Sequence, residues 1–320
     1  MTHLKEIIPP VDKNLLLSEL TKDKFIRYTK NGKNEIYIVN YHNAPNVVRE
    51  IGRLRELTFR NAGGGTGKEI DIDEFDTSEN GYQQLIVWNP EDKEIVGSYR
   101  FILCKNALKN GHLKLATSEL FYFSPQFINE YAPYTIELGR SFIQPKYQPA
   151  EDYRKGLFSL DNLWDGLGAL VVDYPDMRYF FGKVTMYTHF NREARDLILG
   201  FMRHFFPDKD NLVYPIHPIK LEYDISWFID KIKNLSYKDA HLELTHEVKK
   251  RGERIPPLVN NYMNLSSTMR TFGTAINPGF GGVEETGLMV TIADIYPSKK
   301  DRYIQPYIEL KSSLLHKNYP

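Results

Sequence analysis

Two kinds of apolar pattern recur along the chain, and each predicts a different element. Alternation of apolar and polar positions is typical of a half-buried strand, whereas an apolar stripe at helical spacing predicts a helix. On this basis we expect strands at residues 35–41, 84–88, 94–103, 117–123, 135–143, 177–187, 269–276 and 286–295. We expect helices at residues 46–60, 157–172, 191–204, 225–233 and 237–250, with Asn191 as a cap of the third.

The order of these elements predicts one mixed domain. A strand, a helix, several antiparallel strands, a helix, a strand and a helix follow one another, which favours the α+β (α/β) class with a mostly antiparallel, twisted central sheet. Residues 207–265 interrupt this order with short pieces. We therefore expect a single domain at 35–300 with a helical insertion at 207–265, preceded by a polar lead at 1–34 and followed by a tail at 301–320.

The composition limits the classes of protein that fit this chain. Of its 320 residues, 42% are hydrophobic and 13% aromatic, which is enough to fill a substantial core. The 41 basic and 41 acidic residues cancel, so the chain lacks the bulk positive charge of many nucleic-acid binders, and we expect no such partner. Cys104 is the single cysteine, which excludes an internal disulfide and a zinc site built from several thiolates.

The sequence predicts neither a membrane span nor an export signal. The first residues lack the charged and then apolar pattern of a signal peptide. No apolar run approaches the roughly 20 residues that a membrane-spanning helix needs. We expect a soluble, cytoplasmic protein. Peripheral contact with the inner face of the membrane is the alternative. The charged helix expected at 237–250 could lie on a lipid surface, although its moderate apolar content favours ordinary solvation.

Residues 62–69 (AGGGTGKE) resemble a phosphate-binding loop at first sight. Ala62 occupies the position of the first glycine, and Glu69 replaces the serine or threonine that would hold magnesium. The loop also follows an expected helix, whereas a phosphate loop follows a strand. The sequence therefore favours a flexible connection after the helix over a nucleotide site, with a lid ordered by substrate as the alternative.

Residues 71–76 (DIDEFD) begin like a calcium loop. The glycine at the sixth position and the glutamate at the twelfth are both missing. An acidic patch for a cationic substrate group and a solvated turn are the two remaining interpretations. His241 and His246 are five positions apart, which does not suit two ligands on one helix face, so we expect no metal site.

The stretch 136–147 (IELGRSFIQPKY) carries the most informative chemistry. Glu137 is a single carboxylate in an apolar alternation, and a carboxylate beside an arginine in a half-buried strand is costly unless it has a role. A regular strand would point Glu137 and Arg140 to opposite faces, because they differ by three positions. A bulge near Gly139 would bring both into one cleft. Arg100, in another strand pattern, is expected to pair with a nearby acid.

Several short motifs together resemble those of a known family. The chain contains, in this order, Leu54-Arg55 with Phe59-Arg60, residues 71–76, Val96-Gly97-Ser98-Tyr99-Arg100, Glu137-Leu138-Gly139-Arg140-Ser141, Pro145 and Tyr147. This order is similar to that of the ornithine-lipid and glycine-lipid N-acyltransferases, a hemolysin-like group that resembles acyl-homoserine-lactone synthases. The Glu-Leu-Gly-Arg-Ser block is the most specific motif. The similarity extends over about residues 47–295.

The resemblance implies the GNAT acyltransferase fold. It also implies transfer of a fatty acyl group from the thioester of acyl carrier protein to the amine of a small amino acid, of glycine or ornithine type, in amino-acid-lipid biosynthesis. An ammonium group cannot attack a thioester, and Glu137 is expected to be the base that takes its proton. Arg140 and Arg100 are expected to orient Glu137 or to bind the acceptor's carboxylate. Backbone N–H groups after Gly139 are expected to stabilise the oxyanion.

The resemblance also implies binding residues. Substrate-binding positions are expected at Arg55, Phe59, Asp73, Asp76 and Ser141. The phosphopantetheine arm of the donor is expected at a helix start, where Arg154, Lys155 and Gly156 would contact its phosphate. A local Lys/Arg patch is expected to dock the acidic carrier protein. No cofactor is expected beyond the acyl donor, which is acyl carrier protein or, alternatively, acyl-CoA.

The chain departs from the family at one informative place. Where the family commonly has a histidine after the aspartate-rich block, this chain has Asn80-Gly81-Tyr82-Gln83-Gln84. Residues 207–254 match the family least, so the identity of the acceptor is the least transferable expectation. The alternative from another functional class is a non-catalytic GNAT-like module that binds an acyl chain or a carrier protein. The presence of both Glu137 and Arg140 argues against it.

Overall fold

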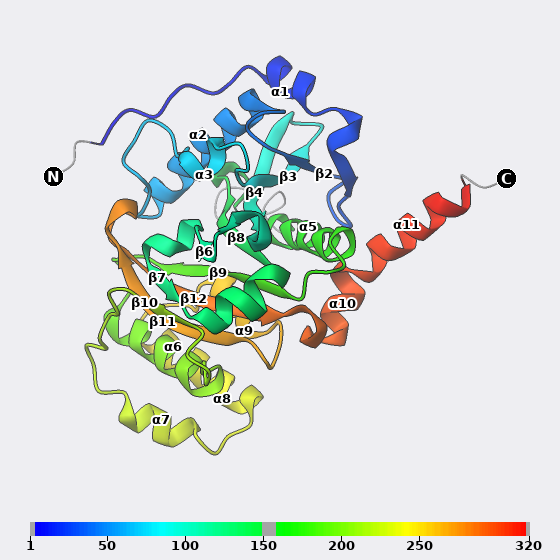
Figure 1. Cartoon of the computed structure of the whole chain (residues 1–320). Helices are drawn as coiled ribbons and strands as arrows, with labels where there is room; N and C mark the ends of the chain where they lie inside the picture. Colours follow the sequence, from blue (N-terminus) through cyan, green and yellow to red (C-terminus); the bar gives the residue numbers. More distant parts are fainter. Residues whose placement is uncertain (1–3, 149–157, 318–320) are drawn as a thin grey trace.

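The computed structural model describes residues 4–148 and 158–317. Its centre is an eight-stranded sheet in the order β1-β2-β3-β4-β8-β9-β12-β11 (Figure 1). These strands are β1 (Phe25–Tyr28), β2 (Glu35–Val39), β3 (Gln83–Asn89), β4 (Glu94–Leu103), β8 (Thr135–Ile143), β9 (Tyr179–Met186), β11 (Arg270–Asn277) and β12 (Val283–Thr291). Neighbouring strands are antiparallel except β8 and β9, which run parallel. The predicted mixed, mostly antiparallel sheet is confirmed.

Two small sheets lie outside the central one. β7 (Phe121–Phe123) pairs with β10 (Val213–Pro215), and β5 (Leu108–Lys109) pairs with β6 (His112–Leu113). The strand predicted at 117–123 is therefore wrong in its first half, where Ala116–Glu119 forms a 3-10 turn. The turn forms because the Thr117 backbone N–H donates to a buried carboxylate of β8 instead of to a neighbouring strand.

The helices predicted from apolar spacing are present. The structure contains α1 (Lys13–Glu19), α2 (Pro45–Asn61), α3 (Glu74–Thr77), α5 (Ser159–Asp173), α6 (Arg192–Phe205), α7 (Ser226–Ile232), α8 (Tyr237–Lys250), α9 (Pro257–Met263), α10 (Pro297–Tyr303) and α11 (Gln305–Lys317). The predicted cap of α6 is confirmed, because the Asn191 side chain accepts the Ala194 N–H at 3.0 Å. α7, α8 and α9 occupy the predicted insertion.

Different elements cover the two faces of the sheet. α2 packs on one face of β2, β3 and β4 through its apolar stripe of Val47, Ile51 and Leu54. The other half of this face, over β9, β11 and β12, is covered by the β7–β10 sheet and its neighbouring turns, with Phe121 and Phe181 buried between them. α5, α6, α7, α8 and α9 share one apolar core on the opposite face. The first face is thus covered by two separate units.

The pairing of β8 with β9 ends in the middle of the sheet. The two strands pair from Thr135 with Tyr179 to Leu138 with Gly182, and both then continue unpaired with each other. Glycine is required at the last pair, since a Cβ on Gly182 would lie 2.5 Å from the Leu138 carbonyl oxygen. The sheet therefore opens immediately after Leu138.

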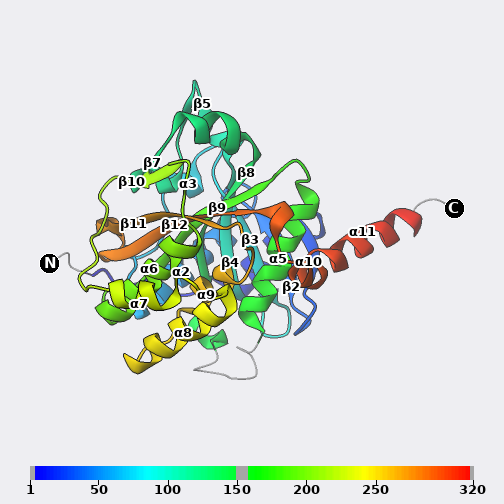
Figure 2. The ribbon, with the colours of Figure 1, turned by 90° about the horizontal axis from the view of Figure 1, so that it is seen from below.

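Both terminal segments contribute contacts to this fold. The Glu19 carboxylate of α1 accepts the backbone N–H groups of Asn46 and Val47 at 3.2 and 2.9 Å, which caps the start of α2. Tyr307 of α11 is buried, and its hydroxyl donates to Asp173 of α5 at 3.2 Å. Beyond this contact α11 extends away from the body of the molecule (Figure 2). Within residues 4–148 and 158–317, every helix is too short or too polar to cross a lipid bilayer.

Candidate active site

A bulge in β8 brings Glu137 and Arg140 to one face of the sheet. Opposite the single residue Tyr99 of β4, strand β8 carries two residues, Arg140 and Ser141. Arg140 adopts a left-handed backbone with a φ of 47°, which is unfavourable for a residue other than glycine. Such local strain is typical of functional sites. The bulge predicted near Gly139 is confirmed.

The Glu137 carboxylate is buried, with 1% of its surface exposed, and is held at both oxygens. The Tyr82 hydroxyl donates to Oε2, and the Thr117 backbone N–H donates to Oε1 at 3.3 Å. The Tyr82 oxygen in turn accepts the Ala116 N–H at 2.9 Å. Tyr82 lies within residues 80–84, where this chain departs from the family, and its phenol contacts the glutamate directly.

Burial raises the pKa of Glu137 to about 8. The Thr117 N–H and the Lys183 ammonium group oppose this rise, and the Asp73 carboxylate adds to it. A carboxyl group with this pKa is mostly protonated at pH 7 and ionises in the range in which amines begin to lose their protons. Glu137 therefore has the protonation behaviour of a general acid–base group.

Glu137 borders a small cavity of about 70 Å³, which we call the inner cavity. Its charged lining residues are Asp73, Arg100, Glu119, Glu137, Arg140 and Lys183. A second space of about 700 Å³, the main pocket, lies in the opening between β8 and β9 and is lined by Phe59 and Ser141 among others. Because Arg140 and Lys183 line both spaces, they mark the place where the two adjoin.

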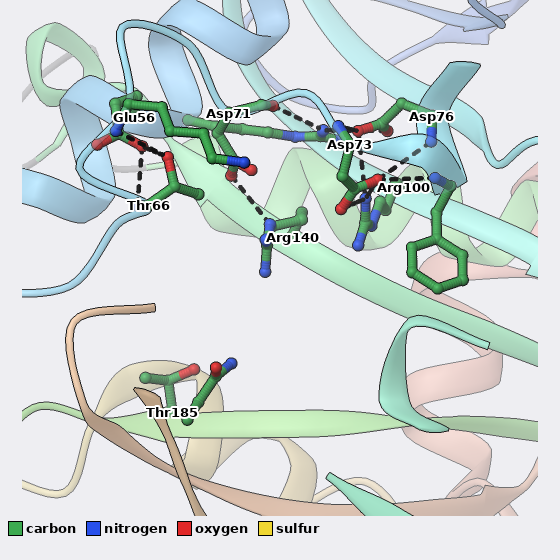
Figure 3. Close-up of polar contacts among 12 residues, drawn as sticks. Glu56, Thr66, Asp71, Asp73, Asp76, Arg100, Arg140 and Thr185 are labelled. Carbon is green, nitrogen blue, oxygen red and sulfur yellow. Dashed lines mark hydrogen bonds and ion pairs between the residues drawn. The ribbon is translucent and has the colours of Figure 1, made fainter. Parts of the chain in front are cut away.

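Arg140 presents one edge of its guanidinium group to an acid and leaves the other edge free. Its Nε lies 2.9 Å from the Asp71 carboxylate, and its guanidinium carbon lies 4.3 Å from the centre of the Phe280 ring. Within the described parts of the chain, its two terminal nitrogens have no hydrogen-bond or ion-pair partner. Figure 3 shows Arg140 and Thr185 pointing toward each other from the two diverging strands.

Beside Arg140, two arginines and two aspartates form a neutral cluster that is buried except for the partly exposed Asp73. Arg100 pairs with Asp73 at 2.8 Å and with Asp76 at 3.2 Å, and Arg55 pairs with Asp76 at 3.1 Å (Figure 3). Burial opposes ionisation of Asp76, but Arg55 and Arg100 hold its pKa below the usual range. The expected acid partner of Arg100 is thus present. Since arginines occupy these carboxylates, the segment 71–76 is neither a calcium loop nor an open acidic patch.

On the β9 side of the opening, a lysine is buried with its own counter-ion. Lys183 forms an ion pair with Glu285, which also accepts hydrogen bonds from Asn277 at 3.0 Å and Thr185 at 3.3 Å. Burial lowers the pKa of Lys183, and Glu285 opposes that effect. Lys183 therefore adds a second cation at the junction of the inner cavity and the main pocket.

The glycine-rich loop surrounds a carboxylate of the protein itself. Glu56 of α2 is fully buried and accepts the backbone N–H groups of Thr66 and Gly67 at 2.9 and 2.8 Å, as well as the Thr66 hydroxyl at 2.7 Å. Gly65 and Gly67 have positive φ angles of 88° and 74°, which these contacts require. The N–H groups that would bind phosphate in a nucleotide loop are occupied.

The structure brings most of the predicted site residues to two adjoining spaces. Glu137, Arg140, Arg100 and Asp73 line the inner cavity. Phe59 and Ser141 line the main pocket. Arg55 and Asp76 lie behind them in the buried cluster, so their contact with substrate stays a prediction. Arg154, Lys155 and Gly156 lie outside the described residues, and their role in binding the phosphopantetheine arm also stays a prediction.

Sequence reasoning missed the residues that approach from other elements. Tyr82, Thr117 and Lys183 contribute to the environment of Glu137 but carry no motif of their own. The departure from the family at 80–84 was the one signal that could have indicated Tyr82. Among the described residues, no cluster of His, Cys, Asp and Glu is arranged to hold a metal. Burial raises the pKa of Cys104 to about 12, so this thiol is not a nucleophile.

The chain is similar in sequence to known acyltransferases. Residues 54–154 match the family model of the acetyltransferase (GNAT) domain. The chain is 51% identical over 308 residues to a glycine N(alpha)-acyltransferase of Phocaeicola vulgatus, covering 96% of this chain and 94% of that protein. It is 53% identical over 312 residues to one of Bacteroides thetaiotaomicron, covering 96% and 91%. The solved structure of the CoA-dependent acyl-homoserine lactone synthase BjaI gives a TM-score of 0.38 at 11% identity, over 86% of this chain and 89% of that one.

The similarity to these relatives extends over nearly the whole chain and nearly the whole of each relative. The predicted GNAT-type fold and the predicted N-acyltransferase activity are confirmed. The alternative of a non-catalytic binding module is therefore not needed to explain the site. This chain is an N-acyltransferase and belongs to the glycine N(alpha)-acyltransferase family.

Proposed function

We propose that this chain transfers a fatty acyl group from the thioester of acyl carrier protein to the α-amine of glycine, and that Glu137 takes the proton of the ammonium group. The observation that carries this proposal is the placement of Glu137. Its buried carboxyl group, with a pKa raised to about 8, borders the same cavity as the free guanidinium edge of Arg140. The names of the two relatives support glycine as the acceptor.

The size and lining of the inner cavity support a small amino acid. A volume of about 70 Å³ has room for roughly five to seven non-hydrogen atoms, which suits glycine, whereas an ornithine side chain would extend beyond it. The free edge of Arg140 matches a carboxylate in a bidentate arrangement. The Thr117 hydroxyl is buried without a hydrogen-bond partner among the described residues and offers a further polar contact.

The reaction follows from these groups. Glu137 accepts one proton from the ammonium group of glycine, and the amine nitrogen then attacks the thioester carbonyl carbon, which forms the C–N bond. Backbone N–H groups after Gly139 are the proposed donors to the resulting oxyanion. When the C–S bond breaks, the thiolate takes the second proton that the nitrogen loses. The products are N-acylglycine, a free thiol and a proton on Glu137 that passes to solvent.

The main pocket is the proposed route of the acyl donor. Its lining runs from Phe59 of α2 on one face of the sheet to Leu258 of α9 on the other, past Ser141 and Lys183 in the opening between β8 and β9. A thioester arm that entered this opening would meet the inner cavity at Arg140 and Lys183. Acyl carrier protein is the proposed donor and acyl-CoA the alternative, since both carry the same phosphopantetheine thioester.

Substitution of Glu137 by Gln tests the assignment of the base. We expect kcat to fall by about 10²–10⁴-fold with little change in the KM of the acyl donor, because only proton transfer is removed. For the unaltered enzyme, log(kcat/KM) should rise with pH up to about 8, since the ionised form of Glu137 is required. A variant that retains near wild-type activity would remove Glu137 as the base.

Two further comparisons separate the substrates. Acyl transfer is measured with the same acyl chain on acyl carrier protein and on CoA, and the donor with the higher kcat/KM is the physiological class. Glycine and ornithine are then offered in competition, and the products are identified by mass spectrometry. A predominance of N-acylornithine would contradict the proposed acceptor while leaving the N-acyltransferase assignment unchanged.

A further inference from the structure

Behind the inner cavity lies a third space, which the proposed reaction does not use. This outer cavity has a volume of about 460 Å³, and its lining includes Ile102, Ala107 and His112. Two aromatic residues, Phe75 and Tyr82, line both the inner and the outer cavity. Their rings meet edge to face with centroids 5.9 Å apart. They therefore form the partition between a space the size of glycine and a much larger one.

The two rings of this partition are held very differently. The Tyr82 hydroxyl donates to Glu137 and accepts the Ala116 N–H at 2.9 Å, which fixes the ring at its polar end. The Arg100 guanidinium lies 5.0 Å from the Tyr82 ring centre and 6.0 Å from that of Phe75. Phe75 is half-buried on the short helix α3, and only apolar and cation–ring contacts hold its ring. Phe75 is therefore the side of the partition that substitution can change independently of Glu137.

The position of Phe75 bears on the choice of acceptor. If Glu137 receives the ammonium group and Arg140 the carboxylate, both polar ends of the amino acid are bound by β8. A substituent on the acceptor's Cα then points away from β8. It extends toward the part of the cavity lining that includes Phe75. Glycine has no such substituent.

We propose that the Phe75 ring determines acceptor specificity by closing the inner cavity against amino acids larger than glycine. This inference rests on the proposed function, because it assumes an amino acid bound between Glu137 and Arg140. Removal of the ring joins the inner to the outer cavity, and the Cα substituent of alanine or serine then occupies the space that the ring has left. Tyr82, which holds Glu137, stays in place.

The test compares Phe75→Ala with the unaltered enzyme on glycine, alanine and serine at a fixed concentration of acyl donor. Hydrophobic pockets discriminate by about 10–200-fold for each methylene. We therefore expect the ratio of kcat/KM for alanine to that for glycine to rise at least about tenfold, with an unchanged KM of the acyl donor. An unchanged ratio in a variant that still acylates glycine would overturn the role of Phe75 and leave the proposed function intact.

Two further variants keep the test decisive. Phe75→Trp retains the apolar anchor of α3 and enlarges the ring, so we expect the KM of glycine to rise and alanine to remain excluded. Phe205→Ala is the control, because it removes a half-buried ring of α6 that packs on Phe201 and Tyr237 and lines neither cavity. The ratio of kcat/KM for alanine to that for glycine should stay unchanged in this variant. An equal rise in Phe205→Ala would mean that general loosening, and not the partition, sets the ratio. Absence of transfer to glycine in the unaltered enzyme would instead contradict the proposed function.

Discussion

At the scale of the residue, the site depends on the carboxyl group of Glu137, whose ionised form is buried at a cost in free energy. Among the residues that the structure describes, Glu137 has no arginine partner, because Arg100 pairs with Asp73 and Asp76, and Arg140 pairs with Asp71. The Thr117 N–H and the Lys183 ammonium group favour the ionised form of Glu137, yet burial outweighs them and raises its pKa to about 8. The separation of Glu137 from these ion pairs is what keeps its proton exchangeable near neutral pH.

The raised pKa predicts how pH affects stability. In the unfolded chain Glu137 ionises near 4.5, and in the folded protein near 8, so between these values the folded state holds a proton that the unfolded state has released. The contribution of this group to the free energy of unfolding is therefore full below about pH 4.5 and falls as the pH rises to about 8, by on the order of 1 kcal/mol per pH unit.

Glutamine cannot ionise and does not follow this dependence. We expect the melting temperature of Glu137→Gln, relative to the unaltered protein, to increase between pH 5 and pH 8.5 and to level off above that range. Differential scanning calorimetry across the range measures this difference. If the difference in melting temperature between the two proteins is the same at all pH values, the carboxyl group is not protonated in the folded protein.

Arg140 offers a second prediction at this scale. A charge-assisted hydrogen bond contributes about 1.5–3 kcal/mol, so loss of the free guanidinium edge in Arg140→Ala should raise the KM of glycine by about 10–100-fold. Arg140→Lys keeps the charge without the planar edge, so its KM for glycine should lie between those of the unaltered enzyme and Arg140→Ala. Asp71→Asn removes the ion-pair partner of Arg140 but leaves the free guanidinium edge in place. Of the three variants, we therefore expect it to change the KM of glycine least. An equal KM in all four proteins would exclude Arg140 from acceptor binding.

At the scale of the element, β8 could be predicted from sequence because its signals are local. The alternation around Glu137 predicts the strand, and a bulge near Gly139 is the predicted way to bring Arg140 to the same face; the structure contains this bulge. The contacts of Glu137 could not be predicted in the same way. Tyr82 is 55 positions away and Thr117 is 20 positions away, and both reach the carboxylate only because other elements are folded. For this reason the sequence predicts a strand from residue 117, where the structure has the turn Ala116–Glu119.

The junction of β8 and β9 gives the prediction that belongs to this scale. In Gly182→Ala the new Cβ would lie 2.5 Å from the Leu138 carbonyl oxygen, so the strands must separate where their pairing ends. We expect a loss of about 1–3 kcal/mol in the free energy of unfolding, measured by urea denaturation, and a lower kcat. Gly139→Ala is the matched control, because its Cβ would meet Arg100 at an ordinary 3.7 Å and stability should change little. Equal stability of both variants would show that this close approach is not required.

At the scale of the whole molecule, the ends of the chain take part in one folded unit. The sequence predicts a lead at residues 1–34 and a tail at 301–320, because the contacts of these segments are with elements distant along the chain. In the structure β1 forms the sheet edge, and Arg302 pairs with Asp165 of α5 at 3.0 Å. Such contacts depend on which surfaces the rest of the fold leaves available.

Paired truncations locate the end of this unit. Removal of all residues after Ile304 deletes the buried Tyr307, whose ring lies under the Arg27 guanidinium at 5.4 Å and whose hydroxyl donates to Asp173. Loss of a buried aromatic residue costs about 3–5 kcal/mol, so we expect a clearly lower melting temperature together with retained acyl transfer at low temperature. Removal of all residues after Ser313 leaves these contacts in place and deletes the exposed Leu314. We expect the melting temperature of this shorter truncation to match that of the full chain. If the longer truncation is equally stable, the folded unit ends before α11 and the expected tail is correct.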